Sequence, residues 1–311
     1  MNLINGLHHI TAIARNAQLN HDFYTEVLGM RMVKKTVNFD DPGTYHLYYG
    51  DSEGTPGSIL TFFPWPGIRR GRAGVGMIGE ISYAVPENSV DFWRNRFEEL
   101  KVNYHPVIER FEEKLLPFED SEGLRLNLHF TGNISDAKSR STKDIHENNA
   151  VGGFRGVSLM LKEVHQTAIV LTEILGYKFF KKEGNCYRYV TNVPGAVSVV
   201  DLFEIPKETR GLVGAGTYHH VAFRVKNEEE LMSMRNVIVQ HHLSVTEKID
   251  RNYFYSIYFR EPGGVLFEVA TDNPGFSVDE PMSELGTHLK LPEQYEHNRK
   301  HIESVLPPLH S

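Results

Sequence analysis

The residues best suited to chemistry in this chain are two histidines and one glutamate that lie far apart in the sequence. The histidines occur in adjacent pairs, His8-His9 and His219-His220, within short β-prone runs. Glu268 lies in an otherwise apolar run, where a carboxylate without a partner is costly to bury. Two imidazoles and one carboxylate on one side of a site suit Fe(II), and they leave coordination positions open for a substrate and O2.

An internal repeat indicates which elements hold these residues. Residues 25–32 resemble residues 172–179, a shift of 147 positions (172 − 25), close to half of the 311 residues. Each half divides again, because a strand-like run begins each quarter, at residues 7–14, 78–85, 154–161 and 218–225. A helical stretch and further strand-like runs follow. The sequence therefore predicts an α+β chain of four βαβββ modules in two tandem halves.

Equivalent positions of the four modules differ in their chemistry. In the first strands, His9 corresponds to Gly156, and His220 corresponds to Glu80. In the last strands, the residues four positions after a glycine are Thr61, Asn127, Val199 and Glu268. We expect one functional site, built from modules one and four, and one degenerate set in modules two and three.

The choice within each histidine pair follows from strand geometry. Adjacent residues of a strand face opposite sides, so one histidine of each pair points toward the site. The matching contexts His9-Ile10 and His220-Val221 favour the second histidine in both pairs. A register error of one residue would move both ligands together.

The length of the chain and a polar segment near its middle indicate the domain organisation. A chain of 311 residues suggests about two domains. We expect the halves at residues 1–135 and 150–272, joined by the polar segment 131–149. Residues 273–311 then form a C-terminal arm, in which residues 292–306 have the pattern of one amphipathic helix.

Composition excludes several partners. The net charge is −7 and no long basic tract occurs, which argues against nucleic acid and anionic membranes as partners. No apolar run reaches the length of about 18 residues that a transmembrane helix needs, and no secretory signal is visible at the N-terminus. Cys186 is the single cysteine, which fits a reducing compartment. We expect a cytoplasmic protein, with a homo-oligomer left open.

The modules and their polar residues resemble the vicinal-oxygen-chelate superfamily over residues 5–272. That superfamily includes extradiol ring-cleaving dioxygenases, glyoxalase I, and fosfomycin-resistance and bleomycin-binding proteins. Residues 258–268, Tyr-Phe-Arg-Glu-Pro-Gly-Gly-Val-Leu-Phe-Glu, resemble the extradiol signature that ends in the ligand glutamate. Residues 42–51 and 62–67 further resemble the hydroquinone-type ring-cleaving branch. The resemblance implies cupped sheets of mixed and antiparallel strands.

The resemblance also implies roles for individual residues. It implies that the metal would be Fe(II), bound by His9, His220 and Glu268, and that the substrates would be O2 and a small aromatic diol. Tyr258 would hydrogen-bond the substrate oxygen, and Arg251 would stabilise anionic charge near the place where catechol-cleaving relatives carry a histidine. Two weaker candidates for acid–base work are His46 and His242, and the candidates for an apolar pocket wall are Phe62, Trp65 and Tyr255.

Alternative readings remain open from the sequence. Mn(II) and Zn(II) are also compatible with two histidines and a carboxylate. A glyoxalase-type enzyme usually takes a carboxylate from each paired module, but Thr61 stands in the second carboxylate position. A thiol-transfer metalloenzyme and a non-catalytic small-molecule-binding resistance protein are the other two alternatives. The exact diol is not encoded in any motif.

Overall fold

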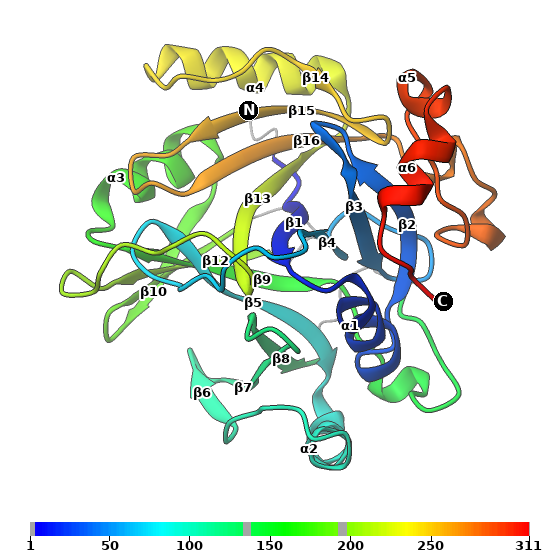
Figure 1. Cartoon of the computed structure of the whole chain (residues 1–311). Coiled ribbons are helices and arrows are strands. Elements are labelled where there is room, and N and C mark those ends of the chain that lie inside the picture. The colour runs from blue at the N-terminus through cyan, green and yellow to red at the C-terminus, as the bar shows by residue number, and fades with distance from the viewer. Residues whose placement is uncertain (1–3, 133–137, 192–197, 311) are drawn as a thin grey trace.

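The computed structural model describes residues 4–132, 138–191 and 198–310, which form an α+β protein with two mixed eight-stranded sheets (Figure 1). The strand order is β14-β15-β16-β13-β1-β4-β3-β2 in the first sheet and β10-β11-β12-β9-β5-β8-β7-β6 in the second. Within the described residues, no helix is long and apolar enough to cross a membrane.

The first sheet combines the modules at the two ends of the chain. Module one contributes β1 (Leu7–Ala14), α1 (Ala17–Asp22), η1 (Phe23–Val27), β2 (Arg31–Asn38), β3 (Asp41–Gly50) and β4 (Ile59–Pro64). Module four contributes β13 (Thr217–Val225), α4 (Glu228–Gln240), β14 (Ile249–Asp250), β15 (Phe254–Arg260) and β16 (Leu266–Pro274). The two first strands, β1 and β13, pair antiparallel at the centre.

The second sheet combines the two middle modules in the same way. Module two contributes β5 (Met77–Pro86), η2 (Glu87–Ser89), α2 (Val90–Glu99), β6 (Ile108–Arg110), β7 (Glu113–Glu119) and β8 (Arg125–Thr131). After η3 (Glu147–Asn149), module three contributes β9 (Phe154–Leu161), α3 (His165–Ile169), η4 (Val170–Ile174), β10 (Lys178–Glu183), β11 (Cys186–Val190) and β12 (Val199–Glu204). Each sheet therefore takes one module from each half of the chain, while the predicted domain limits of 1–135 and 150–272 stay predictions.

Local sequence explains the helices that cover these sheets. In α4, the side chain of Asn227 caps the first turn by accepting a hydrogen bond from the Glu230 backbone N–H. Leu231, Met234 and Ile238 form the buried face, at the spacing of one side of a helix. The glycines after the first helices of modules one and three have positive φ angles, 71° at Gly29 and 72° at Gly176, a conformation that glycine adopts readily at helix ends.

The strand pairing corrects one of the four residues that were predicted to be equivalent in the last strands of the modules. In the first sheet, Thr11 lies opposite His220, and in the second sheet Ser158 lies opposite Glu80. Thr11 pairs with Thr61 on its other side, whereas Ser158 pairs with Asp201. The prediction of Val199 was therefore wrong by two positions. Gly195, from which it was counted, precedes the first residue of β12 by four residues, whereas the glycine of each other module precedes its last strand by two. The other three assignments agree with the register.

The C-terminal arm also differs from the sequence prediction. One helix over residues 292–306 was expected, but the structure has two, α5 (Glu293–Glu296) and α6 (Arg299–Val305), after the short turns η5 (Phe276–Val278) and η6 (Met282–Glu284). The arm lies beside β2 and β3 (Figure 1), and Leu289 forms a bridge with Lys35 of β2. The arm therefore covers the edge of the first sheet.

A buried lysine fixes this arm. The Nζ of Lys34 is fully buried and lies 2.6 Å from both a carboxylate oxygen of Asp279 and one of Glu280. We expect Lys34→Met to lower the free energy of unfolding by about 3–5 kcal/mol, because Glu280 would keep a buried charge without its cation. Urea unfolding measures this change. Lys181→Met, which breaks an exposed pair with Glu112, should change stability by less than about 1 kcal/mol. Equal effects of the two variants would contradict the assignment.

Candidate metal centre

Three potential ligand atoms from three strands converge in the first sheet. The Nε2 atoms of His9 (β1) and His220 (β13) lie 3.4 Å apart. Oε2 of Glu268 (β16) lies 3.3 Å from the first of these nitrogens and 2.9 Å from the second. These three residues are 3%, 5% and 0% exposed, respectively. The structure thus brings together the three residues that the sequence nominated.

Strand register explains the convergence. The parallel pair β13–β16 places Glu268 beside Ala222, and the antiparallel pair β1–β13 places His9 opposite the same residue. His220 precedes Ala222 by two positions and so faces the same side of the sheet. Alternation along the strands, rather than any loop, therefore aims the three side chains at one point.

The first histidine of each pair supports the second. Nδ1 of His8 lies 2.9 Å from Nδ1 of His9, and Nδ1 of His219 lies 2.8 Å from Nδ1 of His220. The other ring nitrogen of His8 lies 3.0 Å from the carbonyl oxygen of Thr271. These contacts orient the rings of His9 and His220 and leave both Nε2 atoms free to face Glu268.

The three side chains fit a divalent cation. Both carboxylate oxygens of Glu268 are fully buried, and neither accepts a hydrogen bond with proper donor geometry from the described residues. Burial raises the pKa of this carboxyl, but His9 and His220 outweigh burial and hold the pKa well below its usual range. Burial also lowers the pKa of His220, which favours the neutral imidazole that a metal requires. A cation would satisfy the orphaned oxygens and both nitrogen lone pairs.

A cavity of about 450 Å³ is lined by His9 and His220 of this set. Its apolar walls are formed mainly by Phe39, Phe63, Trp65, Ile249, Phe254 and Leu266. Its polar groups near the ligands include His46, Tyr48, Arg251 and Tyr258. Flat apolar walls and a few polar groups beside the cation position are features of a site for a small ring-shaped ligand.

Tyr258 and Arg251, both nominated from the sequence, line this cavity together. Tyr258 is the cross-strand partner of Glu268, and Nε of Arg251 donates a hydrogen bond of 3.3 Å to the Tyr258 hydroxyl. Burial raises the pKa of Tyr258 well above its ordinary value, so the phenol keeps its proton. Arg251 also lies 3.5 Å from Asp40, an exposed carboxylate at the cavity rim. The cavity therefore holds a neutral phenol, Tyr258, and a positively charged guanidinium, Arg251, next to the potential metal ligands.

Other sequence candidates divide between the cavity and the rest of the molecule. Trp65 and His46 line the cavity. His242 is exposed just after α4 and Phe62 packs on Tyr24 in the core, so neither belongs to the site. Tyr255 is not among the residues that line the cavity. The sequence reasoning missed Thr11, although its position two residues after His9 on one strand was a usable signal.

Thr61 occupies the position that corresponds to Glu268 in the paired module. Thr61 lies beside Thr11, two residues after His9, just as Glu268 lies beside Ala222, two residues after His220. Its hydroxyl is 2.9 Å from that of Thr11 and 2.9 Å from Nε2 of His46. A second carboxylate is therefore replaced by a hydroxyl that takes part in hydrogen bonds.

Arginines occupy the corresponding region of the second sheet. Arg188 donates to both carboxylate oxygens of Asp201 at 2.8 Å, and Arg110 donates to Glu80 at 2.6 Å. The His9, His220 and Glu268 set is the one group of three or more potential ligands that converges in the described chain. Guanidinium groups thus neutralise the carboxylates Asp201 and Glu80 of the second sheet.

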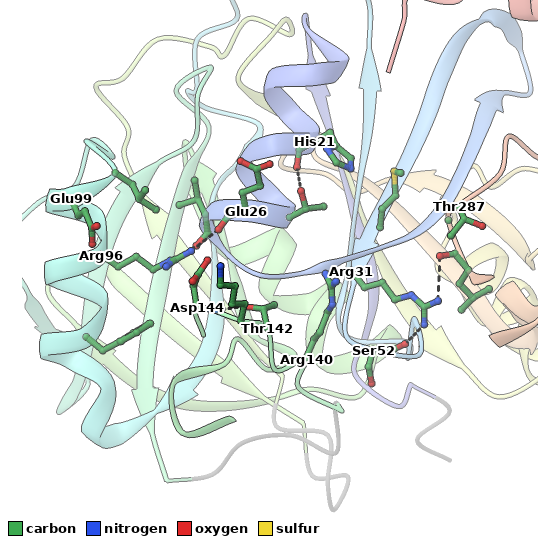
Figure 2. A pocket seen from close by; sticks show the side chains of 18 of the residues that line it. His21, Glu26, Arg31, Ser52, Arg96, Glu99, Arg140, Thr142, Asp144 and Thr287 are labelled. Carbon is green, nitrogen blue, oxygen red and sulfur yellow. Dashed lines mark hydrogen bonds between the residues drawn. The ribbon is translucent and has the colours of Figure 1, made fainter. Parts of the chain in front are cut away.

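A larger cavity of about 1330 Å³ lies elsewhere, between η1, α2, residues 140–144 and the C-terminal arm (Figure 2). Its arginines point to backbone carbonyls: Arg31 donates to Ser52 and Leu285, and Arg140 donates to Met30. None of the three potential metal ligands lines it. The smaller cavity is therefore the candidate active site.

Comparisons with known proteins show what this chain is similar to. The family model described as "Glyoxalase/Bleomycin resistance protein/Dioxygenase superfamily" matches residues 6–128 and 155–269. The chain is 45% identical over 303 residues to "Putative ring-cleaving dioxygenase MhqO" of Bacillus subtilis, covering 97% of this chain and 96% of the relative. It is 31% identical over 302 residues to "Chlorohydroquinone/hydroquinone 1,2-dioxygenase" of Sphingobium indicum, covering 94% and 93% of the two chains.

Solved structures give the same result for the fold. A crystal structure from Bacillus subtilis, described as a "putative dioxygenase", has a TM-score of 0.95 at 44% identity and covers 100% of this chain and 99% of its own. Glyoxalase I from Zea mays has a TM-score of 0.64 at 12% identity, covering 86% and 92%, which supports the likeness of fold alone.

Proposed function

This chain belongs to the glyoxalase/bleomycin resistance protein/dioxygenase superfamily, and from that premise we propose that it is an Fe(II)-dependent, extradiol-type ring-cleaving dioxygenase. Its proposed substrates are O2 and a hydroquinone or catechol-like aromatic diol, as the name of the 31% identical relative suggests. A role in quinone and aromatic detoxification and a cytoplasmic location are part of the same proposal.

One observation carries the proposal: three protein ligands, rather than four, converge beneath a cavity with aromatic walls. Thr61 stands where a second carboxylate would give a fourth ligand. Three ligands leave a divalent metal with positions for both a substrate oxygen and O2. This arrangement favours oxygen chemistry over a glyoxalase-type reaction.

The residues around the ligand set have defined roles in this proposal. When bound, Fe(II) supplies Lewis acidity and the ability to pass electrons toward O2. Phe63, Trp65 and Phe254 would sandwich the aromatic ring and exclude water. The protonated hydroxyl of Tyr258 would donate a hydrogen bond to the substrate oxygen, and Arg251 would stabilise the negative charge that develops there.

Oxygen consumption tests this function directly. We expect anaerobically purified protein loaded with Fe(II) to consume about one O2 per hydroquinone or catechol, without releasing hydrogen peroxide, because both oxygen atoms enter the product. An oxygen electrode combined with mass spectrometry of the product measures this stoichiometry. A Zn(II)-loaded sample is the control and should consume none. An absence of uptake by the Fe(II)-loaded sample on every diol tested would overturn the proposal.

A further inference from the structure

A chain of four hydrogen bonds connects the buried phenol of Tyr48 to the candidate metal centre. The Tyr48 hydroxyl lies 2.8 Å from Nδ1 of His46, and Nε2 of His46 lies 2.9 Å from the Thr61 hydroxyl. Thr61 lies 2.9 Å from the Thr11 hydroxyl, which lies 2.9 Å from Nε2 of His220. Each junction is short enough to hold one hydrogen.

The direction of these hydrogen bonds is set at the Tyr48 end. Tyr48 is 1% exposed, and His46 Nδ1 is the one hydrogen-bond partner of its hydroxyl among the described residues. Burial raises the pKa of Tyr48 well above its ordinary value, so the hydroxyl stays protonated. It therefore donates a hydrogen bond to Nδ1 of His46. Nε2 of His46 then carries the ring hydrogen and donates a hydrogen bond to the Thr61 hydroxyl. The reverse order would leave a buried phenol donor unpaired.

At the His220 end, a bound cation would fix the direction of the remaining hydrogen bonds. His220 would hold the cation through the lone pair of Nε2, and this nitrogen could then neither donate to Thr11 nor accept from it. Thr61, which receives a hydrogen bond from His46, turns its own hydrogen toward Thr11. The hydrogen of Thr11 is then left to point at whatever oxygen occupies the coordination position next to His220.

We propose that His46, held by Tyr48, is a positioning residue that directs the hydroxyl hydrogens of Thr61 and Thr11 toward an anionic ligand coordinated beside His220. This inference rests on the proposed function for the identity of that ligand, a deprotonated diol oxygen. It also explains what Thr61 does, because the position that could hold a fourth ligand instead relays a hydrogen bond. Ring contact between His46 and Tyr48, with centroids 4.1 Å apart, holds the imidazole in place.

Fluoride binding to the Co(II)-loaded protein tests the chain without turnover, because fluoride is an anion that accepts hydrogen bonds and changes the visible spectrum of Co(II). We expect His46→Leu to weaken fluoride binding by about fivefold, the effect of one neutral hydrogen bond, while Co(II) affinity stays within about twofold of the wild type. His46→Gln should restore fluoride binding, because an amide can accept from Tyr48 and donate to Thr61.

Two further variants complete the test. Tyr48→Phe should weaken fluoride binding in the same direction as His46→Leu, which keeps the inference testable if the leucine variant does not fold. Thr217→Val, a buried threonine of β13 whose hydroxyl bonds to Gly214, is the matched control and should leave fluoride binding unchanged. Unchanged fluoride binding in a folded His46→Leu protein overturns the inference. If His46→Leu does not fold, unchanged fluoride binding in Tyr48→Phe overturns it. Equal losses in the leucine and glutamine variants also overturn it.

Failure of the proposed function would have a different signature. If no diol supports O2 uptake but His46→Leu still loses fluoride affinity, the ring-cleaving function is wrong and the hydrogen-bond chain stands. If diols are cleaved and fluoride affinity does not depend on His46, the function stands and the inference is wrong.

Discussion

Replacing Glu268 with glutamine is expected to lower the affinity for divalent metal by more than about 100-fold, because removing even a group that only supports a ligand lowers metal affinity by about 10–100-fold. Glu268 is the one carboxylate of the converging set, and its oxygens have no hydrogen-bond donors among the described residues that would hold an amide in the same place. Isothermal titration of the metal-free protein with Mn(II) or Zn(II), together with elemental analysis, measures this loss.

The pseudo-symmetry of the chain provides a matched control for Glu268. Glu80 lies in the second sheet at the position that corresponds to His220, and Arg110 neutralises it. Glu80→Gln should therefore leave metal content at one ion per chain, the same as in the wild type. His220→Ala should lose the metal while keeping the fold. Metal that persists in Glu268→Gln or His220→Ala would show that the ligand assignment is wrong.

Replacing Arg251 with methionine is expected to lower kcat for diol cleavage by roughly 10²–10³-fold, the usual effect of removing one group that stabilises developing charge. The guanidinium donates to the Tyr258 hydroxyl and lies above the ring of that residue, 5.4 Å from its centroid. Removing the cation therefore also frees the phenol that we expect to contact the substrate oxygen. Tyr258→Phe should lower kcat by roughly 10²-fold for the same reason.

Two measurements separate this role from a structural one. Steady-state kinetics should be normalised to bound iron, which both variants should retain, because neither side chain belongs to the converging ligand set. Arg260→Met is the control: its guanidinium is exposed, donates to the carbonyl of Gly264, and does not line the cavity. A parallel fall of iron content and kcat in Arg251→Met would assign the residue to metal retention instead.

The elements and the convergence of His9, His220 and Glu268 could be predicted from the sequence for one physical reason. Alternation along a strand and a glycine at the entry to the last strand repeat in every module, so equivalent positions can be counted. Counting placed Glu268, Thr61 and Asn127 correctly. It failed at Val199, where the residue beside Ser158 is Asp201, because Gly195 precedes its strand by four residues instead of two, and the spacing between a glycine and the start of a strand does not show in a periodic pattern.

Features that depend on contacts between distant elements could not be predicted. The pattern of residues 292–306 fits one helix, yet Arg299 begins a separate one after a break, because the arm bends to pack along β2 and β3. The hydrogen bonds of His46 depend on the pairing of Tyr48 with Thr61 across β3 and β4. No local pattern distinguishes such a histidine from one on the surface.

The pairing of the first module with the last has a consequence for how the protein is made. His9 emerges from the ribosome early, but its partners His220 and Glu268 follow only when most of the chain has been synthesised. The first strand, β1, therefore stays unpaired with its neighbour β13 during most of synthesis. The two middle modules can complete their own sheet before that. Contacts between such distant segments form slowly in folding. Assembly of the proposed metal site is then a late event, because no product that ends before Glu268 contains all three side chains.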